Sequence, residues 1–331
     1  MADFPDPKVI SARLEFQIHG MHWTNTIQRY YVGSTYVYAL QKHDENPDDP
    51  DTHVDVNYIH RLLIDDSTSP ATATYQDSMR MNNVGHTQTL SWYQHNGHDY
   101  FWVGTNFNTN VPDEEKHEDW ADQLGRVEYV AGKTINYTDV SRLITLARAS
   151  QDGSSFGHLY RADSALSSDN GHMLVWAENN YKMYPSETRT IRYTIYDFNA
   201  INVALDAAEI AGRKTIACDD AEVRAAVVYH EYSETKDFFL PHGSCQGVEL
   251  TNADSIYVCG GGSADFPEFG RMSHTGGSQT SVEAQNPEFK DHKSETEGIQ
   301  IKDNRVYFGI TDSDNPIDER FHIWSFPSSD F

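Results

Sequence analysis

The sequence predicts an all-β protein, with a five-bladed β-propeller as the expected fold and a two-sheet β-sandwich as the alternative. Runs of β-branched and aromatic residues recur along the chain, among them AAVVYHEY at 225–232, and clusters of Asn, Asp, Gly, Ser and Pro separate them. This pattern is typical of antiparallel β structure. In addition, one strand–turn–strand phrase occurs five times. The expected exception is a single helix at 199–212, where the apolar residues have helical spacing and Gly212 marks the end.

The repeated phrase is clearest at residues 85–105, GHTQTLSWYQHNGHDYFWVGT, which reads as small and polar residues, a first strand, a polar turn and an aromatic second strand. Related phrases contain NTIQRYY, YRADSA, GSCQGVEL and ETEGIQI. Each phrase carries one Gln, Asp or Glu among its small residues, and these marker residues are Gln28, Gln88, Asp163, Gln246 and Glu297. The markers divide the chain of 331 residues into five units, which favours a closed five-fold ring.

Each unit is long enough for a four-stranded propeller blade and its connecting loops. Because a blade cannot bury both faces alone, the blades are expected to pack into one closed domain that spans residues 1–331. ARLEFQIHG near the N-terminus and FHIWSFP near the C-terminus are expected to share one blade and so fasten the ring.

Three segments are predicted to be surface loops. Residues 42–55 and 112–123 are acidic and poor in strand-forming residues. Residues 272–295 have the composition of a flexible segment. A protein that lacks residues 275–286 is therefore expected to keep its fold.

The charge of the chain limits its partners. There are 50 acidic residues against 25 basic ones, for a formal net charge of -25, which argues against nucleic acids and anionic membranes as electrostatically attracted partners. The sequence contains no run of 18 apolar residues, so no membrane-spanning helix is expected. The N-terminal residues show no basic region followed by an apolar stretch, so any export is expected to use another route.

The three cysteines do not form a stabilising framework. Cys218, Cys245 and Cys259 include no CxxC pair, and an odd number leaves at least one thiol unpaired. A disulfide between Cys245 and Cys259 would require that the two residues face each other on paired strands.

The first strand of each propeller blade lines a central channel, so the marker residues are expected to converge there. His86 and Arg161 each lie two residues before a marker and join this ring. Oxygen-rich side chains around a pore suit Ca²⁺, with Asp163 and Glu297 as the expected carboxylate ligands. Two other interpretations stay open: the polar groups bond only to backbone and ordered water, or the two carboxylates act as general acid and base.

Other catalytic signatures are absent from the sequence. It contains no HExxH, no compact set of zinc ligands and no GxSxG elbow, and CGGGS at 259–263 lacks the Lys and the helix of a phosphate-binding loop. An enzyme is therefore not the first expectation. Most large aromatic residues are expected in the core, although one or two at a channel mouth would suit a sugar ring; these are Tyr30, Tyr36, Trp92, Trp102 and Trp176.

The phrases VGSTYVYALQ, GHTQT, YTIYDFNAINVALD, QGVELTNADSIYV and SETEGIQI, spread from Val32 to Ile301, resemble the helveticin J family of large, heat-labile bacteriocins. YRADSA stands where the family pattern His-Ala-Glu is expected, which puts a shared catalytic carboxylate there in doubt, although Asp163 keeps the charge. The family brings no agreed catalytic residues. The positions that match its phrases are His86, Thr87, Gln88, Gln246, Glu297 and Gln300.

The resemblance implies a secreted antibacterial protein that acts at the envelope of related Gram-positive bacteria. Because an anionic envelope repels an acidic protein, we expect recognition of a surface glycan or receptor through the mouth of the ring. The alternatives are a metal-dependent propeller hydrolase of the glycosidase or lactonase type, and a carbohydrate-binding or interaction propeller that does not kill. The residues expected to form the channel ring or bind a ligand are Gln28, His86, Gln88, Arg161, Asp163, Gln246, Glu297 and Gln300.

Overall fold

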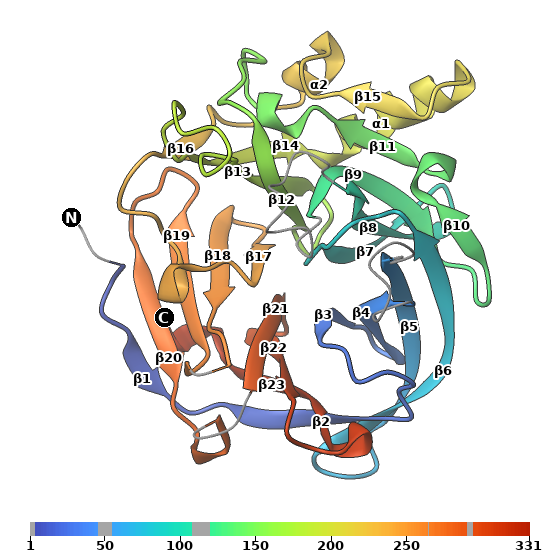
Figure 1. The fold of residues 1–331 in the computed structure, drawn as a ribbon, viewed down its shortest axis with the longest axis vertical. Coiled ribbons are helices and arrows are strands. Elements are labelled where there is room, and N and C mark those ends of the chain that lie inside the picture. Colours follow the sequence, from blue (N-terminus) through green and yellow to red (C-terminus); the bar gives the residue numbers. More distant parts are fainter. Residues whose placement is uncertain (1–3, 46–54, 108–119, 264, 290–293) are drawn as a thin grey trace.

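The computed structural model describes residues 4–45, 55–107, 120–263, 265–289 and 294–331. Within them, five β-sheet blades surround a central axis (Figure 1). Each innermost strand contacts the next around the ring, and the last returns to the first. These strands are β3 (Ile27–Val32), β7 (Leu90–His95), β12 (Leu159–Leu166), β17 (Gly247–Leu250) and β21 (Ser294–Lys302). The prediction of a five-bladed β-propeller is confirmed, and the sandwich alternative is wrong.

Within each blade the strands follow one another outward by antiparallel pairing. The first blade continues from β3 through β4 (Tyr36–Asp44), β5 (Asp55–Asp65) and β6 (Ala71–Asn82). The second continues from β7 through β8 (His98–Phe107), β9 (Ala121–Glu128) and β11 (Ser141–Ile144). The third continues from β12 through β13 (His172–Asn179), β14 (Ile191–Asp197) and β16 (Tyr232–Glu234).

The last two blades use strands from both ends of the chain. The fourth continues from β17 through β18 (Ser255–Gly260), β19 (Glu268–Ser273) and β20 (Thr280–Ala284) to the N-terminal β1 (Lys8–Ile10), which pairs in parallel. The fifth continues from β21 through β22 (Arg305–Asp312) and β23 (Phe321–Pro327) to β2 (Arg13–His19). Since β2 pairs with both β23 and β6, it joins the fifth blade to the first. Two further edge strands, β10 (Thr134–Asn136) and β15 (Thr215–Ala217), pair in parallel with β6 and β11.

The expected helix is present as α1 (Phe198–Ile210), where the side chain of Asp197 accepts a hydrogen bond from the Ala200 amide at 2.9 Å and caps the first turn. A second, short helix, α2 (Ala221–Ala225), was not expected. The predicted strand at 225–232 is wrong, because this run begins inside α2 and reaches a strand only at its last residue. After Ala225 the run leaves the helix as an irregular segment, in which Val228 and Tyr229 are both 36% exposed rather than buried in a strand.

The prediction of a loop at 272–295 is also wrong. The segment contains β20, which pairs with β19 and β1 and places Val282 and Ala284 in the core with no exposed surface. Deletion of residues 275–286 would therefore remove a strand of the fourth blade. Of the two predicted acidic loops, residues 46–54 and 112–119 lie outside the described part of the chain. The predicted bounds are too wide, because residues 42–44 belong to β4, residue 55 to β5 and residues 121–123 to β9.

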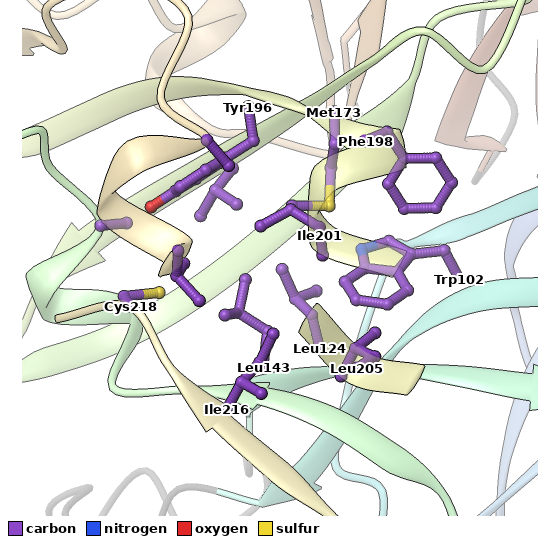
Figure 2. Packing of buried hydrophobic residues seen from close by; sticks show 14 of the residues in the cluster. Trp102, Leu124, Leu143, Met173, Tyr196, Phe198, Ile201, Leu205, Ile216 and Cys218 are labelled. Atoms are coloured by element: carbon purple, nitrogen blue, oxygen red, sulfur yellow. The ribbon is translucent and has the colours of Figure 1, made fainter. Parts of the chain in front are cut away.

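The hydrophobic core is divided among the contacts between blades. Among the described residues, five buried clusters occur, and each joins two neighbouring blades around the ring. Figure 2 shows the cluster between the second and third blades, where Trp102 and Leu124 meet Met173, and α1 covers the outside with Phe198 and Leu205. Since each blade buries both of its faces in this way, closing the ring leaves no blade face exposed to water.

All three cysteines are buried free thiols, so Cys245 and Cys259 do not form a disulfide. They lie on neighbouring segments, where the amide of Gln246 donates to the Cys259 carbonyl at 2.8 Å. Burial raises the pKa of the Cys245 thiol to about 12, which keeps it unreactive.

Candidate functional site

A hydrogen-bonded ring of polar side chains lies across the channel at the beginning of the inner strands. Gln88 is its centre, because its Nε2 donates to Oε1 of Gln246 at 2.8 Å and to Oε2 of Glu297 at 2.6 Å. The backbone amide of Gln88 donates to Oδ1 of Asp163 at 2.9 Å. Arg161 donates to the Gln88 side-chain oxygen. The structure thus brings four of the five marker residues together, from four different blades.

Asp163 is fully buried, and protein donors engage both of its carboxylate oxygens. Oδ2 accepts from Nε of Arg161 at 2.8 Å, while Oδ1 also accepts from the hydroxyl of Thr89 at 3.2 Å. A buried carboxylate is stable only when it is paired and hydrogen-bonded in this way. Asp163 and Arg161 therefore form a buried ion pair within β12, and their hydrogen bonds to Gln88 and Thr89 link the third blade to the second.

Trp120 lies against this pair and was not anticipated from the sequence. The ring of His86 stacks on its indole with centroids 3.9 Å apart and 9° between the planes, while the Arg161 guanidinium carbon is 3.6 Å from the indole centroid. Both groups cannot fit on one face at these distances, so they occupy opposite faces. Burial, with the positive charges of Lys42 and Arg161, lowers the pKa of His86 well below its usual value.

The fifth marker, Gln28, joins the ring through His86, whose Nε2 hydrogen-bonds to its side-chain oxygen. Gln300 lies elsewhere. Its side-chain oxygen accepts from the amide of Val32 at 2.7 Å, so it bridges the fifth and first blades nearer the other end of the channel.

Glu297 differs from Asp163 in its charge state. Only 3% of its surface is exposed, and burial, together with the negative charge of Glu295, raises its pKa well above the usual value. These effects favour the protonated acid, and Gln88 is its hydrogen-bond partner.

A second buried ion pair lies beyond the ring. Arg29, 1% exposed, crosses from the first blade to the fourth, where its guanidinium donates to Oε2 of Glu249 at 2.9 Å and to the Val248 carbonyl at 2.7 Å. It also reaches the Gln88 carbonyl at 3.4 Å. The one available sequence signal was a pair of opposite charges inside the otherwise uncharged inner strands IQRYYV and GVEL.

The raised pKa of Glu249 predicts that the stability of the protein depends on pH. Burial raises its pKa to about 7 from an ordinary 4.5, and Arg29 offsets this only in part. A raised pKa in the folded state contributes stability that is present below pH 4.5 and is lost as the pH rises through about 7. The free energy of unfolding, measured by urea titration across this window, should fall less steeply in Glu249→Gln than in the parent protein. The exposed Glu288→Gln serves as the control, and equal slopes in all three proteins would contradict the assignment.

The ring does not fit Ca²⁺, which the sequence suggested with Asp163 and Glu297 as ligands. Donors of the protein already engage both oxygens of Asp163, and the Arg161 guanidinium supplies the positive charge. In the described part of the chain, no group of three or more His, Cys, Asp or Glu residues is arranged to hold a metal ion.

We therefore expect the melting temperature to be the same in EDTA and in excess Ca²⁺, because the guanidinium of Arg161 already supplies the positive charge at the ring. Differential scanning calorimetry measures this directly. A rise in melting temperature with Ca²⁺ that disappears in Asp163→Asn would show instead that the ring binds the ion.

Fold and site together define a five-bladed β-propeller with a hydrogen-bonded ring of polar side chains across its channel. The model of the family described as bacteriocin helveticin-J matches residues 7–320, and the chain belongs to this family. No curated protein matches the sequence. In the described residues, no helix has the length and apolar character needed to cross a membrane.

Several solved structures show a distant similarity. An exo-β-1,3-galactanase from Phanerochaete chrysosporium aligns with a TM-score of 0.46 at 8% identity over 96% of this chain, which spans only 64% of that enzyme. A β-xylosidase, RS223, aligns with a TM-score of 0.43 at 8% identity, covering 90% of both chains. The periplasmic gluconolactonase of Pseudomonas aeruginosa aligns with a TM-score of 0.37 at 11% identity over 93% of this chain and 70% of that one.

Proposed function

We propose that this protein is a secreted, helveticin-type antibacterial factor that recognises a glycan of the Gram-positive envelope without hydrolysing it. Family membership supports the antibacterial part of the proposal. The observation that supports recognition over hydrolysis is the closed state of the channel ring, where Asp163 is 0% and Glu297 is 3% exposed.

Glycoside hydrolysis needs two carboxyl groups on either side of the scissile bond, with room for the sugar and for water between them. Here the side chain and backbone of Gln88 lie between Asp163 and Glu297 and bond to both. The Arg161 guanidinium holds the remaining oxygen of Asp163. The polar groups of the ring are hydrogen-bonded to one another, so no space for a sugar remains between the two carboxyl groups.

A hydrolase is the second candidate, and one observation favours it. The raised pKa of Glu297 is the property that a general acid requires at neutral pH. Its burial weighs against this role, because a general acid must reach the leaving oxygen of the substrate.

The net charge also favours recognition over direct lysis. A chain with a formal charge of -25 is repelled by an anionic lipid surface, so affinity for the envelope must come from specific contacts. A neutral polymer at the cell surface is the component that this protein can approach without that repulsion.

The test combines growth inhibition of Gram-positive indicator strains with co-sedimentation of the purified protein and their isolated cell walls. We expect both activities in the parent protein and, undiminished, in Glu297→Gln, whose side-chain oxygen can still accept from Gln88. Absence of wall binding and inhibition across the panel would refute the proposal. Loss of both in a folded Glu297→Gln protein would favour the hydrolase.

A further inference from the structure

A cavity of about 670 Å³ lies at the end of the channel away from the polar ring. All five blades contribute to its lining, which places it on the axis of the propeller. The ring residues begin the inner strands, whereas the cavity is lined where β3, β12 and β21 end. The volume is in the range of pockets that enclose small ligands.

The Arg29–Glu249 ion pair lines the inner part of this cavity. Both side chains are more than nine-tenths buried, and Nε of Arg29 has no hydrogen-bond partner among the described residues. A buried donor without a partner costs free energy, so its presence beside a cavity points to a polar ligand or ordered water. The carboxylate and guanidinium together offer an acceptor and donors side by side.

Aromatic side chains form one wall. Trp92 and Tyr31 come from the second and first blades, and their ring centroids are 6.0 Å apart. Both are partly exposed, unlike the core aromatics of these blades. A flat apolar face beside polar groups is the combination that suits a pyranose ring, which carries C–H groups on its faces and hydroxyls around its edge.

Another part of the lining is polar, and hydrogen bonds hold it in place. Lys302 donates to the carbonyls of Val32 at 3.1 Å and Gly33 at 2.6 Å, and Gln300 bonds to the same strand end. The charged groups of the lining are Arg29, Lys302, Glu249 and Asp303, two of each sign. The cavity is thus balanced in charge although the whole chain is strongly acidic, which favours a neutral ligand over an anionic one.

We infer that this mouth of the channel is the binding site for a neutral mono- or disaccharide unit, stacked on Trp92 and hydrogen-bonded by Glu249, Arg29 and Gln300. The inference rests on the proposed function for its biological setting, since the saccharide is then a unit of the envelope glycan. The contacts that define the site stand independently of killing.

The test uses a matched pair of tryptophan variants in the loop between β3 and β4. One variant blocks the mouth of the cavity, and the other is its control. Ser34 and Thr35 are adjacent and exposed, but only Ser34 lines the cavity. Binding of glucose, galactose, N-acetylglucosamine, maltose and lactose is measured by isothermal titration calorimetry and saturation-transfer NMR. For the sugar that binds, Ser34→Trp should weaken the affinity at least about tenfold, whereas Thr35→Trp should bind as the parent does.

Glu249→Gln is a second variant that keeps the shape of the cavity but changes the acceptor, and it should also weaken binding. Melting temperatures of all variants confirm folding. The site assignment is overturned if the parent binds none of these sugars, or if Ser34→Trp binds as well as Thr35→Trp.

Wall co-sedimentation of the same variants separates this inference from the proposed function. If the parent binds walls and Ser34→Trp does so equally well, the glycan proposal survives, but this cavity is not where the wall glycan binds. If Ser34→Trp loses sugar binding while the parent neither binds walls nor inhibits growth, the site is right and the proposed function is wrong.

Discussion

Arg161→Met should lower the free energy of unfolding by about 3–5 kcal/mol, since it leaves the carboxylate of Asp163 buried without its counter-charge. The variant also removes the cation from the face of Trp120 and the donor to Gln88. Urea denaturation followed by tryptophan fluorescence measures the effect.

Arg80→Met is the matched control, because Arg80 pairs with Glu45 while both side chains are 31% exposed. Partly exposed pairs contribute about 1 kcal/mol or less, so this variant should be nearly neutral. Asp163→Asn introduced into Arg161→Met should recover part of the loss, because no unpaired charge then remains. Equal losses for Arg161→Met and Arg80→Met would show that the buried pair does not hold the ring.

Arg29→Met should cause a loss of similar size, about 3–5 kcal/mol, at a pH well above 7, where Glu249 is ionised. It removes the partner of Glu249 and the donor to the Val248 carbonyl, both on the fourth blade. The loss should shrink as the pH falls through about 7, because Glu249 becomes protonated and no longer needs a counter-charge. Urea titrations at several pH values measure this dependence.

The double variant Arg29→Met with Glu249→Gln provides the comparison. Without a carboxylate at position 249, the loss caused by Arg29→Met should be smaller and should no longer change with pH across this window. A pH-independent loss in the single variant would mean that Glu249 is not the group left uncompensated.

The repeated phrase was sufficient to predict the blades and the convergence of the markers. Blade assignment depends on local alternation of strands and turns, which is written in each unit of the sequence. Equivalent positions in equivalent blades face the same channel, so Gln88, Asp163, Gln246 and Glu297 meet even though 51 residues or more separate neighbouring markers.

The pairing of Arg29 with Glu249 could not be predicted from equivalent positions in the blades. Simple alternation along β3 would direct Gln28 and Arg29 to opposite faces, but the strand register shifts between Ile27 and Arg29. A similar shift occurs between Glu297 and Ile299 of β21, where Gly298 has φ of +66° and a Cβ would lie 3.1 Å from the Arg29 Cα. Such irregularities depend on the packing of neighbouring blades, which a single strand does not encode.

Trp120 was missed for a related reason. It lies inside the acidic segment 112–123 that was predicted to be a surface loop, and its importance comes only from His86 and Arg161, which belong to other segments of the chain. The strand β20 was hidden by the Gly- and Ser-rich turn before it, because five residues give too short a pattern to outweigh their flanks.

Incubation of the protein with purified walls of a susceptible Gram-positive strain is the most direct test of recognition without hydrolysis. Bound protein is measured by sedimentation, and newly released reducing ends are measured in the same sample. Saturable binding without release of reducing ends is the predicted result. Release of reducing ends that is abolished in a folded Glu297→Gln protein would contradict it and identify the closed ring as a catalytic site.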